Sequence, residues 1–224
     1  MSTEDGSTEA KQRGHQKHDR LLAVGDIHGR LDLLRKLVRQ VAPTPDDQVV
    51  FLGDYIDRGP EARGVIEFLL EFRQAMPRSV FLEGNHEAML LDYLEGRNRL
   101  FYIINGGGVT LASYRHCNQG RVPPEHLAFF RGLFPYYETE QFIFVHAGLR
   151  PGLPPARQNP EDLLWIRQEF LSSDYDWGKT VVFGHTPVET PYFAAGRIGL
   201  DTGAGHGRAL TCCEVRQQKC WTAS

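Results

Sequence analysis

The stretch "VVFLGDYIDRGP", residues 49–60, joins four apolar residues to a polar turn. The run Val49–Leu52 predicts a buried β-strand, because it is short, rich in apolar residues and followed by turn residues. Pro60 suits the first turn of a helix, and the apolar residues after it recur at helical spacing. The stretch therefore predicts a strand that leads through a polar loop into a helix.

The same plan occurs on both sides of this stretch. Upstream, a predicted strand at Leu21–Val24 leads through "GDIHG" into a helix over Leu31–Val41, which ends before Pro43. Downstream, a strand at Ser79–Leu82 leads through "GNHE" into a helix that extends to about Glu95. Three such units in a row indicate an α/β layered fold, in which ligands bind at the carboxyl ends of the strands.

The remainder of the chain is less regular. "NGGGVTLASY", residues 105–114, is expected to bend close to another segment, and "PPEHLAFFRGLF" predicts a helix begun by proline. A hairpin is expected whose second strand, Phe142–Val145, ends at His146, and "EDLLWIRQEF" predicts one short helix. The final third predicts strands in "TVVFGHTP", "GRIGLDTGAG", "RALTCCEV" and "KCWTA". We expect these strands to form a second sheet that packs face to face on the first, as a sandwich flanked by helices.

Composition describes an ordinary globular chain. The 224 residues are 41% hydrophobic and 24% charged, with a net charge of −3 that gives no basic footprint for nucleic acid. Residues 1–19 are polar and are predicted to be a disordered tail before a single domain over 20–224. No apolar run approaches the roughly 18 to 20 residues of a membrane span, so we expect a cytoplasmic protein without a membrane partner.

The four cysteines show no metal-binding spacing. Cys117, Cys212, Cys213 and Cys220 contain no CxxC pair. Cys212 and Cys213 are neighbours in a predicted strand, where alternation would point one of them into the core. We predict reduced thiols without a metal or redox role.

Five apolar runs each end in residues that can bind a metal. Taken singly, an aspartate in a turn or a histidine in a loop has an ordinary structural explanation. As a set, oxygen and imidazole donors without thiolates suit a divalent ion such as manganese, iron or zinc. Six side chains are too many for one ion with an open position, whereas two ions that share a bridging carboxylate would use all six. The six are Asp26, His28, Asp54, Asn85, His146 and His185.

These motifs resemble those of a known family. "GDIHG" (25–29), "GDYIDRG" (53–59), "GNHE" (84–87), "HAG" (146–148) and "GHT" (184–186) occur in the order and approximate spacing of the phosphoprotein phosphatase superfamily of metallophosphoesterases. The resemblance implies a calcineurin-like fold with two mixed β-sheets packed as a sandwich. It also implies two divalent ions, with manganese as the first candidate and iron or zinc as the alternatives. It assigns Asp26 and His28 to the first ion. It makes Asp54 the bridge, and it assigns Asn85, His146 and His185 to the second ion.

The resemblance also implies the catalytic residues. Arg58 would clamp the substrate phosphoryl group, since a guanidinium matches two phosphate oxygens. His86 would protonate the departing oxygen, with Asp57 orienting it, while a hydroxide between the two ions attacks phosphorus. Arg167 in "LLWIR" resembles a second phosphate clamp of the small bacterial and phage-type members; the alternative is an exposed arginine on an amphipathic helix. Asn85 is also expected to contact the substrate.

The segment "LDTGAG", residues 200–205, resembles the C-terminal loop of the same small members. Asp201 and Thr202 are expected to tie this loop together with local hydrogen bonds. His206 and Asn105 are candidates for lining the site, without an assigned ligand role.

We predict a metal-dependent phosphomonoester hydrolase. It most resembles the small bacterial and phage-type serine/threonine protein phosphatases, which act on a phosphoprotein or phosphopeptide and suggest a monomer. The alternative is a symmetrical bis(5'-nucleosyl)-tetraphosphatase, which would need a base-stacking surface for which Tyr102, Tyr114 and Tyr192 are candidates. A non-catalytic phospho-binding module would be expected to lack a metal ligand, Arg58 or His86, and this chain has all of them.

Overall fold

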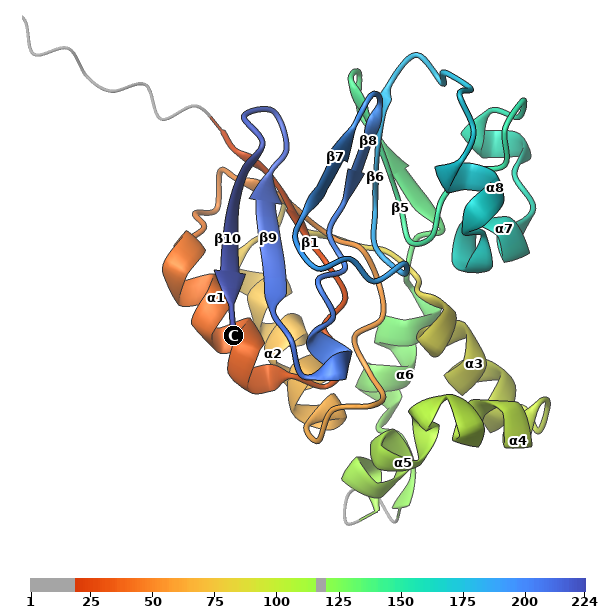
Figure 1. Cartoon of the computed structure of the whole chain (residues 1–224). Coiled ribbons are helices and arrows are strands. Elements are labelled where there is room, and N and C mark those ends of the chain that lie inside the picture. Colours follow the sequence, from red (N-terminus) through yellow and green to blue (C-terminus); the bar gives the residue numbers. More distant parts are fainter. Residues whose placement is uncertain (1–18, 116–119) are drawn as a thin grey trace, which may run out of the picture.

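The computed structural model describes residues 19–115 and 120–224 (Figure 1). Except for Asp19, the predicted tail lies outside the described residues, and so does Cys117. The described chain forms two five-stranded sheets with helices around them, as the family resemblance implied.

The first sheet joins both ends of the described chain. It consists of β1 (Leu21–Val24), β2 (Gln48–Phe51), β3 (Val80–Phe81), β9 (Leu210–Glu214) and β10 (Lys219–Ala223), in the order β10-β9-β1-β2-β3. The strands β1, β2 and β3 run parallel, as three strand–loop–helix units require. β9 and β10 are added antiparallel beside β1.

The second sheet comes from the middle of the chain. It consists of β4 (Tyr136–Glu138), β5 (Phe142–Val145), β6 (Thr180–Phe183), β7 (Tyr192–Ala194) and β8 (Arg197–Gly199), in the order β4-β5-β6-β8-β7. β5, β6 and β8 are parallel, and β4 and β5 form the predicted hairpin. β6 and β8 confirm the prediction that the last strands build this sheet, but it is wrong for β9 and β10. β9 instead pairs with the open edge of β1, and β10 pairs with β9.

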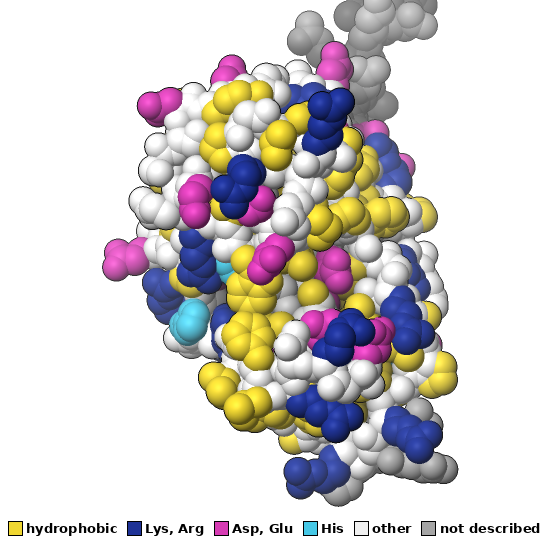
Figure 2. Space-filling model, turned by 90° about the vertical axis from the view of Figure 1, so that its right-hand side faces the viewer, with side chains coloured by type: hydrophobic (Ala, Val, Ile, Leu, Met, Phe, Trp, Pro, Cys, Tyr) yellow, Lys and Arg dark blue, Asp and Glu magenta, His cyan; other side chains and the backbone are white. Residues whose placement is uncertain are grey.

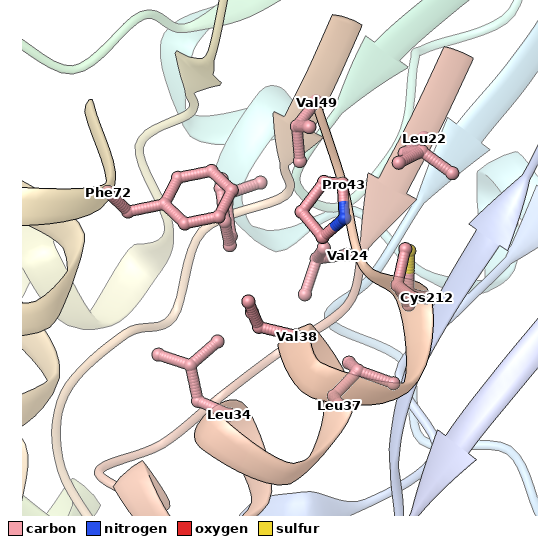
Figure 3. A pocket seen from close by; sticks show the side chains of 11 residues that line it. Leu22, Val24, Leu34, Leu37, Val38, Pro43, Val49, Phe72 and Cys212 are labelled. Atoms are coloured by element: carbon pink, nitrogen blue, oxygen red, sulfur yellow. The ribbon is translucent and has the colours of Figure 1, made fainter. Parts of the chain in front are cut away.

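Two helices cover the outer face of the first sheet. α1 (Leu31–Val41) has the predicted bounds, and α2 (Ala62–Ala75) begins two residues after Pro60. Figure 3 shows Leu34 and Leu37 of α1 projecting toward the side chains of β1 and β2. The space left between them is only about 10 Å³, so helix and sheet are in close contact.

The segment after β3 is helical and contains one sharp bend. α3 (Asn85–Leu94), α4 (Arg99–Tyr102) and α5 (Gly108–Tyr114) follow one another, with a π-helical turn at Ile103–Gly107 before α5. Inside that turn Gly106 has φ of 101°, which favours glycine, and its carbonyl oxygen lies 3.5 Å from the amide of Arg58. The predicted close approach of the glycine run is therefore to Arg58. α6 (Pro124–Arg131) begins at proline as predicted.

The predicted helix over "EDLLWIRQEF" is wrong, because two short helices occupy it. α7 (Pro160–Trp165) and α8 (Gln168–Leu171) are separated by Ile166 and Arg167, which leave the helical conformation. Ile166 is buried against the outer face of the second sheet, together with Leu163 and Phe170. Burying this side chain in an extended conformation ends α7 and frees Arg167 to turn toward the edge of the sheet. Short 3₁₀ turns lie at Pro155–Arg157 and Ala204–His206.

The two sheets pack on each other through a second apolar layer. Ala23 and Val50 from the first sheet meet Phe144, Val182 and Ile198 from the second. Since helices cover the other face, the central strands are buried on both sides. Both Cys212 and Cys213 are therefore buried, one in each layer, and Cys220 is half-buried.

Among the described helices, none is long and apolar enough to cross a membrane.

Candidate dinuclear metal centre

The six predicted ligands come together at one end of the sandwich. Each follows a strand: β1, β2 and β3 of the first sheet and β5 and β6 of the second. Asn85 is the first residue of α3, while the others lie in loops. All six are at most 5% exposed: Asp26, His28, Asp54, Asn85, His146 and His185.

Asp54 lies between two groups of histidines. Its Oδ2 is 3.5 Å from Nε2 of His28, and its Oδ1 is 3.5 Å from Nε2 of His146. Donor atoms of Asp54, His146 and His185 all lie within 4.8 Å of one another, which is close enough for one ion to contact them. The two oxygens of one carboxylate thus face two separate groups, as a bridging ligand must.

Asn85 and Asp26 complete the two groups. The amide oxygen of Asn85 lies 2.9 Å from Nε2 of His146 and 3.0 Å from Nδ1 of His185. The carboxylate of Asp26 accepts the backbone N–H of His185 at 3.0 Å. That contact links the loop after β1 to the loop after β6, so the two sheets are joined at the site.

Backbone carbonyls orient two of the imidazoles. Nδ1 of His28 lies 3.0 Å from the oxygen of Ile56, and Nδ1 of His146 lies 2.8 Å from the oxygen of Leu52. A carbonyl can only accept, so Nδ1 carries the proton in both rings. Nε2 of each ring is left with a lone pair for an ion.

The electrostatics of the site suit a divalent cation. Burial lowers the pKa of His28 to about 3 and that of His185 to about 2, so both rings are neutral donors near pH 7. Burial, together with the carboxylates of Asp201 and Asp54, raises the pKa of Asp26. The buried carboxylates repel one another, and bound cations would relieve this repulsion. Neutral imidazoles beside them supply further donor atoms, so the residues present fit two metal ions.

His86 is held by a buried carboxylate. Its Nδ1 lies 2.7 Å from Oδ2 of Asp57, which is fully buried. The other oxygen of Asp57 accepts the hydroxyls of Tyr102 at 2.8 Å and Thr110 at 2.5 Å. Nε2 of His86 has no hydrogen-bond partner among the described residues and lies 3.9 Å from Oδ2 of Asp54. This nitrogen is therefore open to a group bound beside Asp54.

The geometry also allows a second role for His86. Donor atoms of His28, Asp54 and His86 lie within 4.8 Å of one another, so the ring could contact an ion there. Tyr102 and Thr110 fix the carboxylate partner of His86; the sequence suggested Tyr102 only for base stacking and did not single out Thr110.

The two arginines contact histidines of the two different ligand groups. Nη1 of Arg58 lies 2.6 Å from Nε2 of His28, and Nε of Arg167 donates to Nε2 of His185 at 3.1 Å. Arg167 does not lie within an amphipathic helix, the alternative in the sequence analysis, but in the break between α7 and α8. Both guanidinium groups are within reach of an anion bound between the histidines.

Glu87 has a role that the sequence did not predict. Both oxygens accept backbone N–H groups: Oε2 those of Asp54 and Gly84, at 2.9 and 3.1 Å, and Oε1 that of Tyr55, at 2.9 Å. The carboxylate therefore fixes the loop that carries Asp54. A carboxylate two residues into α3 is also favoured by the backbone N–H groups of the helix start.

The remaining candidates differ in their positions. Asp201 accepts the amide of Gly203, and Thr202 donates to the carbonyl of Ala209, so their hydrogen bonds tie the loop as predicted. His206 is exposed, and Asn105 donates to the oxygen of Phe101 in its own helical segment.

The tyrosines proposed for base stacking lie mostly in the interior. Tyr102 and Tyr114 are at most 1% exposed, so neither can stack on a ligand. Tyr192 is half-buried against Phe183. Tyr102 and Tyr114 are wrong as candidates, because helical spacing and aromatic character also describe core residues.

Comparison with known proteins agrees with this geometry. The model of the calcineurin-like phosphoesterase family matches residues 19–212. The bis(5'-nucleosyl)-tetraphosphatase PrpE [asymmetrical] of Bacillus thuringiensis (strain Al Hakam) is 26% identical over 216 residues, covering 84% of this chain and 87% of that protein.

Solved structures share the fold. A protein described as a diadenosine tetraphosphatase superposes with a TM-score of 0.74 at 22% identity, covering 93% of this chain and 94% of its own. A protein serine/threonine phosphatase from Saccharomyces cerevisiae superposes with a TM-score of 0.62 at 15% identity. The superposition covers 88% of this chain and 73% of the phosphatase chain. At these identities the likeness establishes the architecture alone.

Proposed function

Because the chain belongs to the calcineurin-like phosphoesterase family, we propose that it hydrolyses phosphoesters or phosphoanhydrides at the site around Asp54. The reaction would use two divalent ions, for which manganese is the preferred candidate. The observation that carries this proposal is the position of Asp54, whose two carboxylate oxygens face His28 on one side and His146 on the other. A carboxylate so placed can hold two ions at the short separation that hydrolysis requires.

The residues divide into two ligand sets. One ion would be held by Asp26 and His28. The other ion would be held by Asn85, His146 and His185, and Asp54 would contact both ions. When bound, the ions supply an acidified water and neutralise negative charge on the phosphoryl oxygens.

The other side chains bind the phosphoryl group and deliver a proton. Arg58 and Arg167 donate to the phosphoryl oxygens and hold the group in line for attack. His86 gives the proton on Nε2 to the departing oxygen. Asp57 accepts the Nδ1–H and keeps the ring in that orientation.

A dinucleoside tetraphosphate is the first substrate that we propose. The support is the set of curated relatives named bis(5'-nucleosyl)-tetraphosphatase, which match along most of this chain. Hydrolysis of such a substrate requires a phosphate site together with a surface for a nucleoside, and the environment of the metal centre offers both.

A phosphoserine or phosphothreonine side chain of a protein is the second candidate. It is favoured by the "LLWIR" and "LDTGAG" segments, which resemble the small protein phosphatases. Leu100 and Ile104, on the adjoining α4 and π-helical turn, are 72% and 73% exposed, and a peptide could cover them.

Turnover of both substrates in parallel tests these proposals. Manganese-loaded protein is given diadenosine tetraphosphate and a phosphoserine peptide, with an Asp54→Asn variant as the control. We expect a higher kcat/KM for the dinucleotide and the loss of both activities in the variant. A preference for the peptide would reverse the order of the candidates, and full activity of the variant would contradict the metal centre.

A further inference from the structure

We infer that Trp165 and Phe101 form a subsite that binds the planar base of a nucleotide substrate beside the metal centre. The inference rests on the proposed function, since it supplies the nucleoside surface that a dinucleoside tetraphosphate needs. It takes the place of Tyr102 and Tyr114, which the sequence suggested and which the fold buries.

The two aromatic rings lie directly beside the ligands. The ring of Trp165, the last residue of α7, is 5.9 Å from the ring of His185 at an angle of 86°. Phe101 in α4 lies 5.9 Å from Trp165, with the two planes inclined by 50°. A line of rings thus runs outward from His185, built from two helices far apart in the sequence.

These rings are not buried in the interior. Phe101 is 49% exposed, and Trp165 is partly exposed. In Figure 2, which looks onto the side of the molecule with α3, α4, α7 and α8, hydrophobic side chains gather near the middle of the face and continue below it. Exposed aromatic surface beside a polar site contributes little to folding and is typical of ligand contact.

A hollow of about 590 Å³ is lined by both aromatic rings. Its walls include Asn85, Met89 and Leu164 besides the two aromatic residues. Because Asn85 is also a predicted metal ligand, a substrate held at the metals by its phosphate can extend directly into the hollow. The volume is within the range that holds small organic ligands.

The polar groups of this hollow favour a base rather than more phosphate. Glu161 and Asn98 line it, together with Asp92, whose carboxylate is paired with Arg97, and none of its described lining residues is Lys or Arg. Carboxylate and amide oxygens accept hydrogen bonds from the exocyclic amino group of a base, whereas carboxylates repel phosphates.

The test compares two monophosphates that differ only in the base. Adenosine 5'-monophosphate and ribose 5-phosphate are used as competitive inhibitors of p-nitrophenyl phosphate hydrolysis by the manganese-loaded protein. Base stacking on an aromatic ring predicts that the nucleotide binds about 10-fold more tightly. The ratio of the two inhibition constants removes any general change in the metal centre, because both inhibitors share the phosphate.

Four variants locate the effect. We expect Trp165→Ala and Phe101→Ala to bring the ratio close to one, and Trp165→Phe to retain most of it. Phe101→Ala is needed because the ring of Trp165 also contacts the metal-ligand candidate His185, whereas the ring of Phe101 contacts Trp165. Tyr175→Ala removes an aromatic ring of similar exposure, 43%, that lies against Trp177, and should keep the wild-type ratio.

The outcomes separate this inference from the proposed substrate. A wild-type ratio near one, or a ratio unchanged in both alanine variants, would overturn the subsite even if diadenosine tetraphosphate is hydrolysed. A preference for the nucleotide that both alanine variants lose would support the subsite. If that result came with no hydrolysis of diadenosine tetraphosphate, it would contradict the proposed substrate while keeping a base-binding site.

Discussion

Several residues of the metal centre adopt backbone conformations that residues other than glycine rarely adopt. Five residues at the site have positive φ values: His28, Asp54, Asp57, Arg58 and His185, between 47° and 68°. Each such residue costs about 1–3 kcal/mol and persists only where its surroundings fix it. The sequence showed which residue types gather here, but not the hydrogen bonds, such as those of Glu87, that hold them.

A change at His86 should affect substrates according to their leaving group. We expect His86→Asn to reduce kcat for a phosphoserine peptide by about 100-fold or more, because the alkoxide needs a proton as it leaves. For p-nitrophenyl phosphate, whose leaving group is stable as an anion, the loss should be several-fold smaller. The exposed His206→Asn is the control. Equal losses for both substrates would indicate that His86 is a metal ligand, the other role its geometry allows.

A change at Glu87 should weaken both stability and activity. In Glu87→Gln one carboxylate oxygen is replaced by an amide NH2 group. That group cannot accept a hydrogen bond from the backbone N–H of Asp54 or of Tyr55, which the carboxylate accepts in the wild type. We expect the free energy of unfolding to fall by about 1–3 kcal/mol, measured by urea denaturation, together with a lower kcat. The exposed Glu67→Gln should change either value little. Unchanged stability in Glu87→Gln would show that the carboxylate does not fix the loop.

At the scale of elements, the strand–loop–helix units could be predicted, and the later connections could not. α1 and β5 have the predicted bounds, because apolar periodicity and turn residues are local signals. β9 joins the first sheet through pairing with β1, nearly 190 residues away in sequence, which no local pattern specifies. Likewise, α7 ends because Ile166 is buried against a sheet formed elsewhere.

The turn between β3 and α3 depends on a residue without a side chain. A Cβ on Gly84 would lie 2.2 Å from Oδ1 of Asp54 and 2.3 Å from its amide nitrogen. We therefore expect Gly84→Ala to displace Asp54 and to reduce bound manganese and kcat by at least about 10-fold, measured by metal analysis and turnover. Gly108→Ala is the matched control, since a Cβ there meets nothing within 4 Å and α5 should gain up to about 1 kcal/mol. Normal metal content in Gly84→Ala would contradict the close approach.

At the scale of the whole molecule, a partly buried ion pair joins the starts of the first two strands. Arg20 precedes β1 and Asp47 precedes β2, and their side chains meet at 2.7 Å. Burial alone would raise the pKa of Asp47, but hydrogen bonds from Arg20 and from the amide of Thr44 lower it to about 2. Because the folded value lies below the unfolded value near 4, the carboxylate stabilises the fold above about pH 4.

This pair predicts a pH-dependent effect on stability. We expect Asp47→Asn to lower the free energy of unfolding by about 1–2 kcal/mol at pH 7. The difference from the wild type should shrink as the pH falls from about 4 toward 2, where the wild-type carboxylate becomes protonated. Urea denaturation at pH 7, 5 and 3.5 measures it. A difference that is the same at all three values would mean that the charge of Asp47 does not contribute.

Two sheets and five strand ends converge on one cluster of donors, and the central claim is that this cluster binds two ions for hydrolysis. The most direct measurement is a manganese titration of metal-depleted protein, in which bound ions per chain and phosphoester turnover are recorded together. We expect turnover to reach its plateau only when about two ions are bound per chain. The Asp54→Asn variant should reach neither two bound ions nor the wild-type turnover. Full turnover with one ion or none, or wild-type behaviour of Asp54→Asn, would contradict it.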